Sequence, residues 1–259
     1  MPSHFNCIGF PVEDMDAYWA LARRAVAEGI RHPAPGGGAV VRWAPSQNTP
    51  PNPRLTGPEI WAQVDPNGQV VGATPFFSAG APHRIAITGI GEDPEEPLDG
   101  WIDGWLEPAE EEEPYSGAFP VRVNLVDFPL VRHRITTFPM SGQVEVAALA
   151  HEVELYEDEA AYRAAPGEMY RPPVESFASA AHAGVDEAPG FQEATALVNG
   201  RIAQVRLLIN PVTETPYWWI QIAVHGVTLH TFADRETLGR EPREGYILSG
   251  SFWLVGRMA

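Results

Sequence analysis

Several residues and segments that support common chemistries are scarce or missing in this 259-residue chain. Lysine is absent, and all 17 residues of the lysine and arginine class are arginine. This excludes a lysine Schiff base, a phosphate-loop lysine and a lysine general base. Cys7 is the single cysteine, so an internal disulfide and a multi-cysteine metal site are excluded as well.

Long apolar runs are also missing. No run approaches the roughly 20 residues of a membrane span, and Met1–Phe10 lacks the basic and apolar regions of a signal peptide. We therefore expect a cytoplasmic protein without a membrane partner. The formal net charge of −17 repels a phosphate backbone, so we expect no nucleic-acid partner either.

Catalytic motifs are equally hard to find. The eight histidines show no metal-ligand spacing, and the chain contains neither a Gly-x-Ser-x-Gly elbow nor a nucleotide-binding loop. Cys7 lies in an apolar segment, where a buried and unreactive thiol is expected. These absences favour a non-catalytic binding or protein-interaction module without a cofactor.

The C-terminal part of the chain has the clearest pattern. Apolar and polar residues alternate from Ile202 to Ile209, which is typical of a half-buried strand. Two further β-rich runs, Tyr217–Val224 and Val227–Phe232, are separated only by His225-Gly226, which predicts a tight hairpin turn. Pairing Val224 with Val227 gives one largely apolar face. A short helical link at 234–244 and a last strand at 245–257 complete a small barrel or curled sheet.

The rest of the chain predicts an α+β protein with predominantly antiparallel strands. Segment 13–28 has the spacing of an amphipathic helix. The other predicted elements are strands at 4–12, 39–43, 60–64, 69–77, 84–90, 121–127 and 144–156 and a short helix at 157–165. We expect an N-terminal α/β sandwich-like domain at 1–165, a linker at 166–176 and a β-rich domain at 177–259.

The segment from Glu92 to Glu113 holds eleven acidic residues and no basic one. Two copies of Asp-Gly-Trp lie inside it. If this part forms a strand, one face presents a row of aromatic and acidic side chains, namely Asp99, Trp101, Asp103, Trp105 and Glu107. Indole rings beside carboxylates suit a cationic or carbohydrate-like ligand or an arginine-rich protein surface. The alternative is that the next element of the fold covers the tryptophans.

The N-terminal third also resembles a known family. A strand beginning at His4, a helix to Glu28 and the strands that follow are similar to the βαβββ half-module of the vicinal oxygen chelate (glyoxalase-like) superfamily. The resemblance implies a metal-dependent enzyme in which His4 is a ligand. The other ligands of that family match no specific positions here, so this enzyme is the alternative to a non-catalytic binding module.

Overall fold

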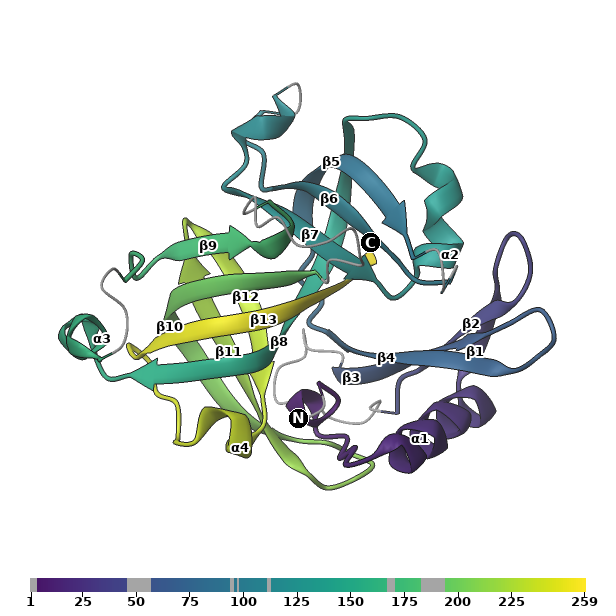
Figure 1. Ribbon diagram of the computed structural model, residues 1–259, viewed down its shortest axis with the longest axis horizontal. Coiled ribbons are helices and arrows are strands. Elements are labelled where there is room, and N and C mark those ends of the chain that lie inside the picture. Colours follow the sequence, from purple (N-terminus) through teal and green to yellow (C-terminus); the bar gives the residue numbers. More distant parts are fainter. Residues whose placement is uncertain are drawn as a thin grey trace.

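The computed structural model describes residues 4–45, 57–93, 96, 98–110, 113–166, 171–182 and 194–259 (Figure 1). Part of the predicted linker, 167–170, lies outside these residues. The helices are α1 (Met15–Glu28), α2 (Phe128–Val131), α3 (Glu159–Ala164) and α4 (Arg235–Leu238), and the 3-10 turns are η1 (Asn6–Ile8), η2 (Pro114–Ser116), η3 (Arg132–Arg134) and η4 (Ala180–His182). The strands are β1 (Ile30–Pro33), β2 (Ala39–Trp43), β3 (Gly57–Val64), β4 (Val70–Ser78), β5 (His83–Glu92), β6 (Gly100–Leu106), β7 (Phe119–Leu125), β8 (Met140–Tyr156), β9 (Ser176–Ser179), β10 (Thr195–Ile209), β11 (Pro216–Val224), β12 (Val227–Ala233) and β13 (Ile247–Met258).

The N-terminal part is a helix packed on a four-stranded sheet. Strands β1 to β4 pair antiparallel in chain order, and α1 packs against β2, β3 and β4 (Figure 1). The helix ends at Glu28 as predicted but begins two residues after the predicted start, because the Asp14 side chain accepts a hydrogen bond from Ala17 N at 2.8 Å and caps the first turn. The β3–β4 hairpin, with its turn at 65–68, also forms as predicted.

The prediction of a strand at 4–12 is wrong. This segment instead turns through η1, with Gly9 in the left-handed region at φ 78° and Phe10 N bonded back to Phe5 O. The physical reason is that Cys7 and Ile8 are both buried, although they are neighbours in sequence. A turn packed on β11 and β12 buries adjacent side chains, whereas a half-buried strand would bury alternate ones.

The other strands form one nine-stranded sheet, which closes on itself twice. Ring A consists of β8, β5, β6, β7 and β13, and ring B consists of β13, β10, β11, β12 and β8. The antiparallel β8–β13 pair belongs to both rings. Each ring is closed by a short parallel pairing, β7 with β13 in ring A and β12 with β8 in ring B. The fold is thus mostly β, with antiparallel pairs predominating, as predicted.

The chain segments β5–β8 and β10–β13 contain the same order of strands and α-helices, although the first also contains the 3-10 turns η2 and η3. Three antiparallel strands, a one-turn helix and a long strand follow one another in β5–β8 and again in β10–β13. The pairings correspond as well, since β5 lies beside β8 as β10 lies beside β13. An aspartate precedes each one-turn helix, Asp127 before α2 and Asp234 before α4. The double ring is therefore an internal pseudo-twofold arrangement.

The C-terminal hairpin has the predicted register. Val224 pairs with Val227, and the pairing continues through Ile222 with Leu229. His225 and Gly226 both have positive φ, at 47° and 78°, as a primed two-residue turn requires.

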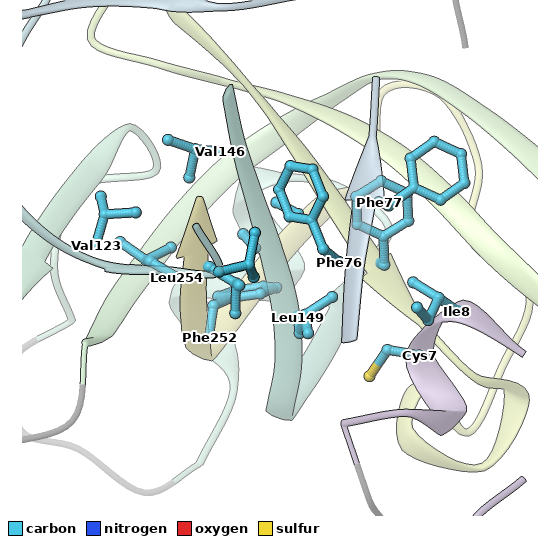
Figure 2. Close-up of a cluster of buried hydrophobic side chains, with 14 of the residues drawn as sticks. Cys7, Ile8, Phe76, Phe77, Val123, Val146, Leu149, Phe252 and Leu254 are labelled. Carbon is cyan, nitrogen blue, oxygen red and sulfur yellow. The ribbon is translucent and has the colours of Figure 1, made fainter. Parts of the chain in front are cut away.

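The division into two domains is not confirmed. Strands from both sides of the predicted linker pair within the nine-stranded sheet, and ring B needs β8 to close. The main hydrophobic cluster likewise draws on both halves. Figure 2 shows Cys7 and Ile8 beside Phe77 of β4 and Leu149 of β8, with Phe252 of β13 nearby.

A buried ionic network joins the four-stranded sheet to the rings. Arg257 of β13 donates to Glu145 of β8 at 2.5 Å and lies 3.7 Å from Glu59 of β3. Both carboxylates are almost fully buried, and Glu59 also forms an ion pair with Arg42 of β2. The Ser78 hydroxyl of β4 donates to Glu145 at 3.1 Å. The positive charges of Arg42 and Arg257 thus neutralise the negative charges of Glu59 and Glu145 where the four-stranded sheet meets the rings.

Candidate functional site

Strand β6 has the alternation that the sequence predicts. Trp101, Asp103 and Trp105 are half-buried on one face, whereas Ile102 and Leu106 are buried on the other. Neither indole lies in the hydrophobic core. Three of the five predicted members therefore share one face, whereas Asp99 and Glu107 lie just outside β6. The partners of each member decide which of them can meet a ligand.

Trp101 and Asp103 already hold a cation of the chain itself. The Arg122 guanidinium of β7 stacks on the Trp101 ring at 4.8 Å and donates two hydrogen bonds to Asp103, at 2.8 and 3.0 Å. The strand register produces this contact, because Asp103 and Arg122 are cross-strand partners. An external cation would have to displace Arg122 from this site.

Trp105 and Glu107 also have partners within the fold. The exposed Tyr115 ring lies edge-on to the Trp105 ring at 6.2 Å. Glu107 accepts hydrogen bonds from the backbone and side chain of Arg84, at 3.2 and 3.3 Å, and its carboxylate lies 3.2 Å from His83 Nδ1. Trp105 with the exposed Tyr115 ring is therefore more accessible to a ligand than Glu107 with Arg84 and His83.

Asp99 differs from the other acidic members of the row. It accepts a hydrogen bond from the Gln63 amide of β3, and the same amide donates to Leu98 O at 3.2 Å. Burial, together with the hydrogen bond to the adjacent Glu96 carboxyl, raises the pKa of Asp99 to about 7, while the Gln63 hydrogen bond opposes the shift. Among the described groups that shift the pKa of Asp99, the charged ones are the carboxyl groups of Glu96 and Asp93, and none is an arginine.

A cleft of about 370 Å³ lies beside this carboxyl pair. One wall comes from Glu96 and Leu98 with Pro129 and Arg132, and the other comes from residues of the β1–β2 and β3–β4 hairpins. The lining residues that matter most for chemistry are Gln63, Val71, Glu96, Leu98, Pro129 and Arg132. Asp65 also lines the cleft, but its carboxylate accepts hydrogen bonds from the backbone of Asn67 and Gln69. The cleft is thus mainly apolar, with Asp99 adjacent and two charged groups on its wall, the Glu96 carboxyl and the Arg132 guanidinium, which forms an ion pair with Glu92.

The sequence did not indicate the walls of this cleft. Gln63 and Val71 lie on a predicted hairpin, but no local pattern shows that this hairpin approaches Leu98. The acidic composition around Asp99 was the usable signal in the sequence. It indicated an unusual loop, but it did not indicate that the apolar hairpin surface with Val71 lies opposite.

His4, the metal ligand of the alternative interpretation, has one other histidine beside it. Its ring lies 5.5 Å from that of His151 and 5.0 Å from that of Trp253. Burial, with a smaller contribution from His151, lowers the pKa of His4 to about 4. In the part of the chain that the structure describes, no group of three or more His, Cys, Asp or Glu side chains is placed to hold a metal ion.

Comparisons of the chain with protein-family models, curated proteins and solved structures found no match. In the described residues, none of the helices combines the length and the apolar character needed to cross a membrane. The geometry of the cleft is therefore the basis for a functional proposal.

Proposed function

We propose that the protein is a non-catalytic binding module that takes an organic cation, such as an amine or a guanidinium group, in the cleft beside Asp99. The observation that carries this proposal is the Asp99–Glu96 carboxyl pair at the edge of a mainly apolar cleft. A cation entering the cleft would be attracted by the carboxylates, and its apolar part would lie against Leu98 and Val71.

The other predicted site residues have a different part in this proposal. Arg122 serves as the internal cation of Trp101 and Asp103, so it models the kind of group that the acidic row accepts. Asp99 is the member of the row that is left for an external cation. A carbohydrate-like ligand is the second candidate, and it is favoured by the exposed Tyr115 ring beside Trp105, because two adjacent aromatic rings offer a stacking surface for a sugar.

The test is titration calorimetry with a panel of small cations, namely L-arginine amide, agmatine and choline, at pH 6 and pH 8. We expect tighter binding at pH 8, because the cation favours the ionised carboxylates. Asp99→Asn should weaken binding about tenfold or more, which corresponds to the loss of one charged contact. Glu214→Gln is the matched control, since Glu214 lies on the equivalent β10–β11 loop of ring B.

Equal affinity of Asp99→Asn and the unchanged protein would contradict the proposal, as would the absence of binding by all three cations at millimolar concentration. A glycan that binds and is lost in Trp105→Ala would support the second candidate instead.

A further inference from the structure

The pseudo-twofold arrangement makes one end of ring A equivalent to one end of ring B. In ring B this end carries the β10–β11 loop at 210–215 and helix α4. In ring A it carries the β5–β6 connection, which contains Glu96 and Leu98, and helix α2. The two ends can therefore be compared for what covers them.

The chain itself covers the end of ring B. The Asn210 side chain donates to Ile8 O at 2.9 Å, and the Thr213 hydroxyl donates to Gly9 O. The Cys7 and Ile8 side chains of η1 are 1% and 0% exposed, and η1 packs on β11 and β12. A short turn segment thus closes ring B with apolar side chains and two backbone carbonyls.

The equivalent end of ring A forms one wall of the cleft. Glu96 and Leu98 of the β5–β6 connection and Pro129 of α2 line it, and the hairpin tips provide the opposite wall. The Val71 side chain of that wall is 43% exposed, although Val71 lies in a strand. The cleft at this end of ring A therefore keeps an exposed apolar side chain, Val71, on its opposite wall, whereas η1 buries its apolar side chains against ring B.

We propose that this cleft receives a short segment of a partner protein, which would cover the end of ring A as η1 covers the end of ring B. In this segment a basic side chain lies next to an apolar one. The inference rests on the proposed function, because the basic side chain is the organic cation. The apolar side chain lies between Val71 and Leu98, and the basic group reaches Glu96 and Asp99. The net charge of −17 favours a basic partner over an acidic one by the same electrostatics.

The probe is a synthetic peptide, acetyl-Gly-Leu-Arg-Leu-Gly-amide, compared by titration calorimetry with L-arginine amide and with the same peptide carrying citrulline in place of arginine. Citrulline has nearly the shape of arginine but no charge. We expect the arginine peptide to bind about tenfold or more tightly than L-arginine amide, because it adds buried apolar contacts. The citrulline peptide should lose most of this affinity.

Val71→Ser tests the apolar contact. It should reduce peptide affinity several-fold and leave the affinity for L-arginine amide unchanged. Ile209→Ser is the matched control, because Ile209 is also a β-branched residue on a strand, is 65% exposed and is not among the residues that line the cleft. Thermal denaturation of both variants checks that neither change unfolds the protein.

The outcomes separate this inference from the proposed function. Equal affinity of peptide and L-arginine amide, with both lost in Asp99→Asn, would leave a small-cation site and overturn the segment inference alone. If neither the peptide nor L-arginine amide binds, both the segment inference and the proposed function are overturned. Peptide binding that Val71→Ser and Ile209→Ser reduce equally would place the peptide elsewhere and overturn the inference.

Discussion

The buried ionic network between the sheet and the rings gives the sharpest stability prediction. In Arg257→Met the partner Glu145, which is 4% exposed, keeps only the Ser78 hydroxyl as a close polar contact of the network. Glu59 is less affected, because it retains Arg42 and the Trp61 indole N–H at 2.9 Å. An unpaired buried carboxylate costs about 3–5 kcal/mol, so we expect the free energy of unfolding to fall by about that amount.

The double variant distinguishes pairing from simple packing. Glu145→Gln removes the buried charge, so Arg257→Met combined with Glu145→Gln should recover to within about 1–2 kcal/mol of the unchanged protein. Urea denaturation at pH 7 measures all members of the cycle. Arg163→Met is the control, because its ion pair with Glu159, one helical turn away, is exposed on both sides and is worth only about 0.3–0.5 kcal/mol. A double variant as unstable as the sum of the two single variants would refute the assigned coupling.

Three further predictions concern single positions. Gly91→Ala places a Cβ 2.3 Å from the Trp101 ring, so it should destabilise the fold by about 1–3 kcal/mol and change the tryptophan fluorescence, and a silent substitution would contradict the packing. The pKa of Asp99 is raised to about 7, so the stability that Asp99 contributes in full below its unfolded pKa of 3.8 is lost as the pH rises through 7. Asp99→Asn should therefore be more stable than the unchanged protein between pH 5 and pH 8 in denaturation curves, with the difference growing as the pH rises to 7. Burial, with a smaller contribution from His83, lowers the pKa of His230 to about 4. The stability that neutral His230 contributes is therefore fully present above pH 6.5 and is lost as the pH falls to 4, by up to about 3 kcal/mol. His230→Gln keeps an acceptor for the Trp219 indole N–H and should reduce this loss of stability at acidic pH.

The parts of the fold that the sequence predicted are those whose pairing is local. The 217–232 hairpin is specified by its two-residue turn and by the alternation of its own strands, and the register followed from them. The ring closures involve β7 with β13 and β12 with β8, which are short parallel pairings between distant segments. No residue pattern within any of these four strands indicates its distant partner, so the double ring could not be predicted from the sequence.

The same distinction applies to the candidate site. Period-two alternation placed Trp101, Asp103 and Trp105 on one face of a strand, and the structure has this face. Alternation does not show what lies above a face, so Arg122 was not foreseen as the partner of Asp103. The turn at 4–12 was missed for a related reason, since burial of adjacent side chains there depends on distant strands.

The sharing of β13 by both rings restricts the order in which the protein can fold. Ring A has four of its strands before residue 157 in the chain, yet it closes only when β13, at Ile247–Met258, pairs with β7 and β8. The early strands therefore leave the ribosome with unpaired edges and must wait for about 90 further residues of synthesis. A fragment ending at residue 165 lacks this strand, so we expect it to be sensitive to proteases and to lack the cooperative unfolding of the full chain. Synthesis of the chain thus sets a window in which exposed strand edges depend on fast completion or on chaperones to escape aggregation.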